Sequence, residues 1–78
     1  MHYTYILKSK IDGKYYVGYT EDLQNRVEMH NKGLVEATKF RAPLLLIYYE
    51  ACLDKYKALK REQYFKTGFG RRFLKDRI

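Results

Sequence analysis

Residues 3–20, YTYILKSKIDGKYYVGYT, hold two short β-prone runs on either side of an Asp-Gly pair. The runs cover residues 3–9 and 14–20 and are rich in tyrosine, threonine and aliphatic residues, which strands favour. An Asp-Gly pair between two such runs is a strong hairpin signal, because Gly13 accepts the positive φ of the turn. The stretch therefore predicts two antiparallel strands joined by a tight turn.

The register of this hairpin decides which side chains meet. With a two-residue loop, Ser9 faces Tyr16 and Leu7 faces Gly18, because paired positions of an antiparallel ladder share one face. The hairpin then places two tyrosines on one side of the sheet. The residues expected on that face are Tyr3, Tyr5, Leu7, Tyr16 and Gly18.

A helix is expected next, over residues 21–32. Thr20 is a suitable N-cap, and Gly33 suits the C-terminal stop. Leu23 and Val27 mark the buried stripe of this helix. Two further side chains lie beside the stripe on adjacent turns, within reach of the sheet: Arg26 and His30.

The chain between this helix and the next strand is expected to be a loop. Residues 34–42 lack a clear period, and Pro43 ends them. Residues 44–51 follow and are apolar enough to predict a central strand. The loop side chains expected to be exposed are Thr38, Lys39 and Arg41.

A second helix is predicted from Asp54, its N-cap, to about Thr67, and a short third helix over residues 71–77. The third helix should pack Phe73 and Leu74 inward. The apolar stripe of the second helix is Ala58, Leu59 and Phe65.

Glu62 falls in the middle of the stripe of the second helix. A carboxylate is rarely buried without a partner, so three explanations stay open. Glu62 forms an ion pair with a basic residue, ligates a metal ion, or lies at the edge of the core facing a cleft.

The composition sets limits on the class of protein. Seventy-eight residues, 46% of them hydrophobic, predict one domain over residues 1–78. Cys52 is the only cysteine, which excludes an intrachain disulfide, and we expect it to be buried. The longest apolar run, residues 44–49, is too short for a membrane span, and no signal peptide is recognisable, so we expect a soluble cytoplasmic protein.

The net charge of +7 is concentrated at one end of the sequence. Residues 1–54 hold seven Lys or Arg against seven Asp or Glu, whereas residues 55–78 hold nine against two. Such an excess indicates either a solvated helical surface or a surface for nucleic acid. The cations that we assign to phosphate contacts are Lys39, Arg41, Lys66, Arg71 and Arg72.

The ordered set of these residues resembles a known family. Tyr3-Thr4-Tyr5 lies in the first strand, and Tyr16-Val17-Gly18 follows in the second, with Tyr16 eleven positions after Tyr5. Arg26, His30 and Glu62 complete the order. This pattern is similar to that of the GIY-YIG nucleases, and above all to their short single-domain bacterial members.

The resemblance implies an α+β fold in which helices flank a three-stranded antiparallel sheet. It also implies hydrolysis of DNA phosphodiesters with one divalent cation, Mg²⁺ or Mn²⁺. By motif position, Glu62 would ligate the metal, Arg26 would stabilise the phosphoryl charge, and Tyr5 and Tyr16 would orient or deprotonate the attacking water. His30 is similar to a histidine that some members use in proton transfer or phosphate contact.

The chemistry is reasonable for these side chains. A cation next to the phosphoryl group offsets the negative charge that develops there, and Arg26 and a divalent ion both supply one. A tyrosine is a weak base at neutral pH, but a neighbouring cation favours its ionised form. On that argument Tyr5 is expected to act as the base.

The sequence also departs from the family pattern. Tyr3, Thr4 and Val17 replace motif residues, and no asparagine follows Glu62, although many family nucleases have one there. Well-characterised members also use a separate DNA-binding domain, so a partner protein would supply specificity here.

Three hypotheses follow. The first is a DNA endonuclease, structure-selective and linked to DNA repair or processing. The second is a non-catalytic nucleic-acid-binding module. The third is an interaction domain whose basic helices bind an acidic protein.

Overall fold

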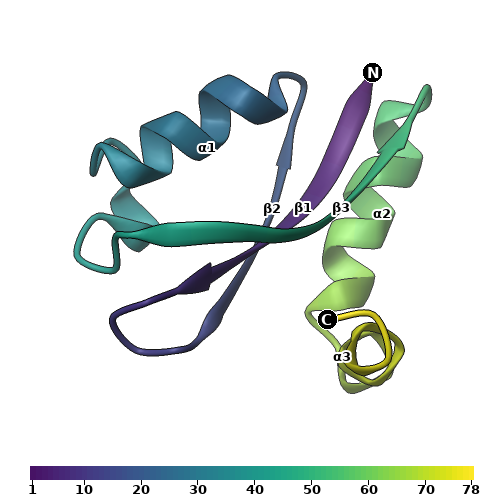
Figure 1. Cartoon of the computed structure of the whole chain (residues 1–78). Helices are drawn as coiled ribbons and strands as arrows, with labels where there is room; N and C mark the ends of the chain where they lie inside the picture. Colours follow the sequence, from purple (N-terminus) through teal and green to yellow (C-terminus); the bar gives the residue numbers. More distant parts are fainter.

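The computed structural model describes all of residues 1–78. Three strands form one antiparallel sheet in the order β2-β1-β3, and three α-helices pack against it (Figure 1). The predicted α+β class is confirmed. The elements are β1 His2–Ser9, β2 Tyr15–Thr20, α1 Leu23–Asn31, a 3₁₀ turn Glu36–Thr38, β3 Leu44–Cys52, α2 Lys55–Phe65 and α3 Gly68–Lys75.

The central strand is β1, so the prediction of a central strand at residues 44–51 was wrong. β1 pairs with β2 on one side and with β3 on the other, and its residues 4–7 are all buried. β3 lies at the edge and leaves Leu45, Leu46 and Tyr49 exposed. An apolar run shows that a segment favours a strand, but its place in the sheet depends on pairing with the rest of the chain.

The two faces of the sheet carry separate cores. Because strand side chains alternate, Tyr5 and Leu7 point to the face that α1 covers, and Leu44 joins them there. Ile6 points to the opposite face and packs against Phe65 of α2 and Leu74 of α3. Figure 1 shows α1 on one side of the sheet and α2 and α3 on the other.

The β1–β2 loop is longer than predicted. It spans residues 10–14, and Leu7 rather than Ser9 lies opposite Tyr16. The Ser9 hydroxyl holds the loop open by accepting the backbone N–H of Ile11 at 3.1 Å. The register has shifted by two positions, and an even shift keeps side chains on the same face. The predicted gathering of Tyr5 and Tyr16 on one face is therefore confirmed.

The helix boundaries differ from the prediction at two N-termini. Asp22, not Thr20, caps α1 by accepting the backbone N–H of Asn25 at 3.1 Å. α3 begins at Gly68, three residues earlier than predicted, because the Thr67 hydroxyl caps it. The cap at Asp54 and the stop at Gly33, whose φ is +75°, are confirmed.

Two smaller observations complete the fold. Cys52 is half-buried rather than buried, and its thiol donates to the backbone carbonyl of Asp54 at 3.1 Å. None of the helices has the length and apolar character that crossing a membrane requires.

Candidate active site

Tyr5 lies at the centre of the candidate site and is fully buried in the middle of β1. Its ring crosses the partner strand at Gly18, directly opposite in the β1–β2 register. A Cβ atom built on Gly18 would overlap the Tyr5 phenol. Glycine is therefore required at this position because the tyrosine ring occupies the space of its missing side chain.

Replacing Gly18 by alanine is expected to displace the Tyr5 ring and to lower the free energy of unfolding by about 1–3 kcal/mol, as other overpacked cores do. Urea unfolding measures this change. Gly68→Ala is the matched control, because a Cβ there meets no atom within 4 Å. Equal stability of the Gly18 and Gly68 variants would contradict the assigned role of Gly18.

A chain of hydrogen bonds runs from Tyr5 through His30 to Thr38. The Tyr5 hydroxyl lies 2.8 Å from Nε2 of His30, and Nδ1 of His30 lies 2.6 Å from the Thr38 hydroxyl. All three side chains are fully buried. The prediction that Thr38 is exposed was wrong, because the 3₁₀ turn carries its hydroxyl inward to the second nitrogen of His30.

His30 is neutral in this environment. Burial lowers the pKa of His30 to about 4, and the nearby positive charge of Arg26 adds to the shift. Both ring nitrogens are occupied by hydroxyl groups, so neither is free to contact a phosphate. The geometry therefore favours His30 as the residue that holds Tyr5 in place.

The depressed pKa of His30 makes stability depend on pH. The unfolded chain binds a proton at this histidine near its ordinary pKa of 6.5, whereas the folded chain does not until about 4. The free energy of unfolding should therefore fall as the pH is lowered from 6.5 towards 4. Urea unfolding across this range measures the slope, and His30→Gln should flatten it. A wild-type profile as flat as the variant's would contradict the prediction.

Burial and the Arg26 cation have opposite effects on the pKa of Tyr5. Burial raises the pKa of the Tyr5 phenol, and this outweighs the lowering caused by Arg26. The charges of Tyr16 and Glu62 add to the rise. Burial therefore favours the neutral phenol, and the role of Tyr5 as a base stays a prediction.

Tyr16 lies next to Tyr5 but is only partly buried. Its ring centre is 6.3 Å from that of Tyr5 and 5.0 Å from that of His30. Of the two tyrosines, Tyr16 is the one with surface open to solvent. It is therefore better placed than Tyr5 to touch a water molecule or a substrate.

Arg26 presents an uncompensated positive charge to the site. Its side chain forms no ion pair, its guanidinium lies beside the Tyr5 hydroxyl and lowers the pKa of that phenol, and its buried Nε has no hydrogen-bond partner. Arg41 also has an unpartnered nitrogen, but its Nε bonds Asp12 at 3.0 Å. A buried donor without a partner costs roughly 1–3 kcal/mol, which an incoming anion would relieve. Arg26 thus has a free donor for an anionic ligand.

Glu62 lies on α2, its charge raises the pKa of the Tyr5 phenol, and it lacks a strong partner. Its side chain is 17% exposed and makes no hydrogen bond, and Lys66 Nζ lies 3.6 Å from one carboxylate oxygen. That distance is longer than a hydrogen bond, and Lys66 is half exposed, so the ion pair is weak. Of the three explanations for Glu62, the structure shows the ion pair, in a weak form with Lys66, and Glu62 lines neither groove of the molecule.

The fit to a metal ion depends on Glu62 alone. No three His, Cys, Asp or Glu side chains gather as a metal site. Mg²⁺, however, keeps several waters and often binds proteins through one or two carboxylates. A single glutamate whose oxygens accept no hydrogen bond has the free acceptors that such an ion needs.

The cations assigned to phosphate contacts lie in different parts of the molecule. Lys66 and Arg71 line the same groove, between α2, α3 and β2. Lys39 lies in the loop after α1 and pairs with Glu36 at 3.1 Å. Arg72 is exposed and stacks on Phe69, with 4.8 Å between the guanidinium carbon and the ring centre.

Arg41 is half-buried, and the prediction that it is exposed was wrong. Its ion pair with Asp12 ties the β1–β2 loop to the segment before β3. The backbone N–H of Lys14 and the Arg41 cation lower the pKa of the Asp12 carboxyl. Arg41 therefore has a structural partner.

Comparison with known proteins identifies relatives over nearly the whole chain. The family model described as the GIY-YIG catalytic domain matches residues 1–75. A UPF0213 protein of Staphylococcus saprophyticus is 44% identical over 75 residues, which cover 95% of this chain and 90% of that protein. A UPF0213 protein of Staphylococcus aureus is 46% identical over 67 residues, covering 85% and 80%.

A solved structure also matches. The solution NMR structure of a UPF0213 protein from Bacillus halodurans has a TM-score of 0.59 and 33% sequence identity. The match covers 96% of this chain and 82% of that one.

Proposed function

The chain belongs to the GIY-YIG family, and from this premise we propose that it is a metal-dependent endonuclease that hydrolyses phosphodiester bonds in DNA. The family is one of nucleases, and the relatives named above are bacterial UPF0213 proteins. The observation that carries the proposal is that Arg26 and Glu62, a cation and an anion, each lack a strong partner and both shift the pKa of Tyr5.

Arg26 would bind the scissile phosphate. A phosphodiester repels a nucleophile because its oxygens are negative, and the charge grows as the nucleophile attacks. The guanidinium presents several donors in a planar fork that matches phosphate oxygens. Because its Nε is already desolvated, little reorganisation is needed when the phosphate arrives.

Glu62 would hold one divalent cation, Mg²⁺ or Mn²⁺. When bound, such an ion neutralises charge on the phosphate and makes its water more acidic. Glu62 contributes a carboxylate whose oxygens accept no hydrogen bond.

The tyrosines would position the attacking water. Tyr16, which is open to solvent, offers its hydroxyl to that water. His30 lies within hydrogen-bonding distance of the Tyr5 hydroxyl, and Gly18 leaves room for the Tyr5 ring. The Tyr5 ring in turn packs against the ring of Tyr16. Because His30 stays neutral, the buried Tyr5–His30 pair adds no second positive charge that would compete with Arg26 for the phosphate.

The proposal is tested by incubating the protein with supercoiled plasmid and with branched or flapped DNA, in Mg²⁺ or Mn²⁺ and in chelator. Cutting that requires the metal ion supports the proposal. Absence of cutting on every substrate, with binding intact, would replace it with the non-catalytic nucleic-acid-binding module. The finer parts of the proposal are a role in DNA repair or processing, a cytoplasmic location and a partner protein that supplies specificity.

A further inference from the structure

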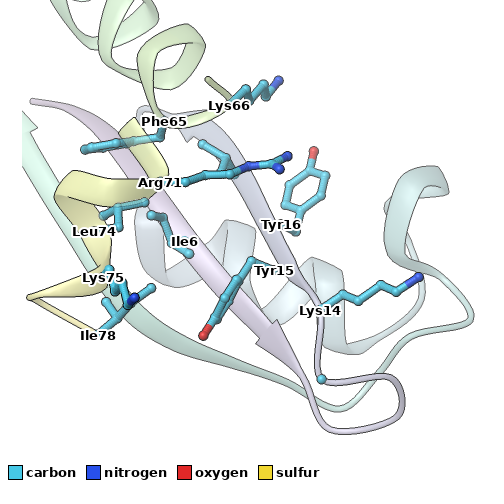
Figure 2. Close-up of a pocket in the computed structure, with 12 residues that line it drawn as sticks. Ile6, Lys14, Tyr15, Tyr16, Phe65, Lys66, Arg71, Leu74, Lys75 and Ile78 are labelled. Carbon is cyan, nitrogen blue, oxygen red and sulfur yellow. The ribbon is translucent and has the colours of Figure 1, made fainter. Parts of the chain in front are cut away.

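A basic groove lies on the face of the sheet opposite α1, between β2 and the C-terminal helices. We call it the α3 groove, and its volume is about 860 Å³. Figure 2 shows its residues converging from β1, β2, α2 and α3. Its walls combine the apolar core of that face with the side chains of α3.

The rim of the α3 groove is positively charged. Four cations line it, and no acidic side chain does. Two of them, Lys14 and Lys75, were not among the cations assigned from the sequence. The four cations are Lys14, Lys66, Arg71 and Lys75. Such a rim suits a chain of phosphates, whose charges repeat along its length.

The floor of the α3 groove is apolar and includes an accessible aromatic ring. Val17 and Ile78 supply accessible aliphatic surface, over the buried side chains of Ile6 and Leu74. Tyr15 is 52% exposed, and Lys8 Nζ lies 5.8 Å from its ring centre. A flat ring of this kind, with cations around it, is the surface on which unpaired bases stack.

The combination of rim and floor distinguishes between forms of nucleic acid. A double helix keeps its bases stacked inside and offers phosphates to a protein surface, so an apolar floor would gain nothing from it. A single strand offers phosphates and base faces together. We infer that the α3 groove binds an unpaired strand of nucleic acid, with its phosphates on the rim cations and a base against Tyr15.

The α3 groove is continuous with the candidate active site. Tyr16 lines the groove and also packs against His30, and Figure 2 shows Arg71 extending towards Tyr16. Lys66 lines the groove and lies 3.6 Å from Glu62. A strand in the groove therefore reaches Tyr16, and at Lys66 it passes next to Glu62, which does not itself line the groove. That the bound strand is a substrate rests on the proposed function, and it predicts a preference for DNA with an unpaired strand beside the cut.

The test compares binding of a fluorescein-labelled oligothymidylate with that of a duplex of the same length, by anisotropy in chelator, so that cleavage plays no part. Wild-type protein should bind the single strand more tightly. Tyr15→Ala should weaken this binding about fivefold or more. Arg71→Ala should lower the slope of log Kd against log salt by about 0.7, the value for one phosphate contact on a single strand.

Arg72→Ala is the matched control, because it removes the same charge from the adjacent position of α3 but does not line the groove. It should leave the slope and the affinity near those of the wild type. Circular dichroism checks that each variant is folded. Equal effects of Arg71→Ala and Arg72→Ala, or a duplex bound as tightly as the single strand, would overturn the inference. The inference would also be overturned if heparin displaced the labelled oligonucleotide as effectively as unlabelled single strand does.

The two proposals can fail separately. Groove-dependent binding of the single strand without any cleavage would keep the groove and reject the endonuclease. Cleavage that needs Glu62, with no effect of Tyr15→Ala or Arg71→Ala on binding, would keep the endonuclease and reject the groove.

Discussion

Glu62→Gln is expected to lower the rate of metal-dependent DNA cleavage by on the order of a thousandfold, because a catalytic metal ion contributes several kcal/mol to transition-state stabilisation. Glutamine keeps the shape of the side chain but removes the negative charge that would hold the cation. The fold should be unaffected, since Glu62 forms no hydrogen bond and its ion pair with Lys66 is long and partly solvated.

The measurement pairs a plasmid cleavage assay with calorimetric titration of Mn²⁺ into the same protein. Glu62→Gln should lose both cleavage and the binding heat of Mn²⁺. Glu28→Gln is the matched control, because Glu28 is an exposed carboxylate on α1, and it should retain both. A folded Glu62→Gln protein that cuts DNA at the wild-type rate would exclude Glu62 as the metal ligand.

Arg26→Met is expected to reduce the cleavage rate by about 10²–10³-fold, which is the usual effect of removing one charge-stabilising donor. The same substitution should not reduce the free energy of unfolding. The buried Nε of Arg26 has no partner, so replacing the side chain with an apolar one of similar length should leave the free energy of unfolding unchanged or raise it. A gain in stability that accompanies a loss of activity is the mark of a site built for a ligand.

A second readout is independent of cleavage. The Arg26 cation helps to lower the pKa of His30, so Arg26→Met should raise that pKa from about 4, although burial keeps it below 6.5. NMR titration of the His30 ring measures the change. Arg72→Met removes an exposed cation far from His30 and should not move it. If the pKa of His30 and the cleavage rate both stayed at wild-type values in Arg26→Met, the placement of Arg26 in the site would be wrong.

The sequence predicted the strands and the gathering of the two tyrosines because both depend on local patterns. The alternation of side chains along a strand survives any even error in register, so Tyr5 and Tyr16 shared a face even though the loop had five residues instead of two. Asp54 and Gly33 were predicted correctly for the same reason, since caps are local features.

The parts that could not be predicted depend on contacts between distant segments. Thr38 follows His30 by eight positions and carries no local sign of burial, but the 3₁₀ turn brings it to the imidazole. Arg41 meets Asp12 across 29 positions. In sequence, a loop residue that is exposed looks the same as a loop residue that is buried against a distant segment.

The α3 groove was missed for a related reason. Lys14 lies in the first hairpin loop, outside the basic C-terminal third on which the charge argument rested, whereas Lys75 lies at the end of α3. Charge counted along the sequence found the excess but not its arrangement. Arg71 and Arg72 are neighbours in the chain, yet only Arg71 turns into the groove, because helix positions one apart face different directions.

The buried chain of Tyr5, His30 and Thr38 has a consequence for reading the sequences of relatives. These three side chains hold the interior together through two hydrogen bonds, so selection for a folded protein alone would retain them. Arg26 and Glu62 contribute little to folding and would drift once cleavage was no longer needed. On the proposed function, a relative that keeps the tyrosine and histidine but has lost the arginine or the glutamate would be a degenerate enzyme.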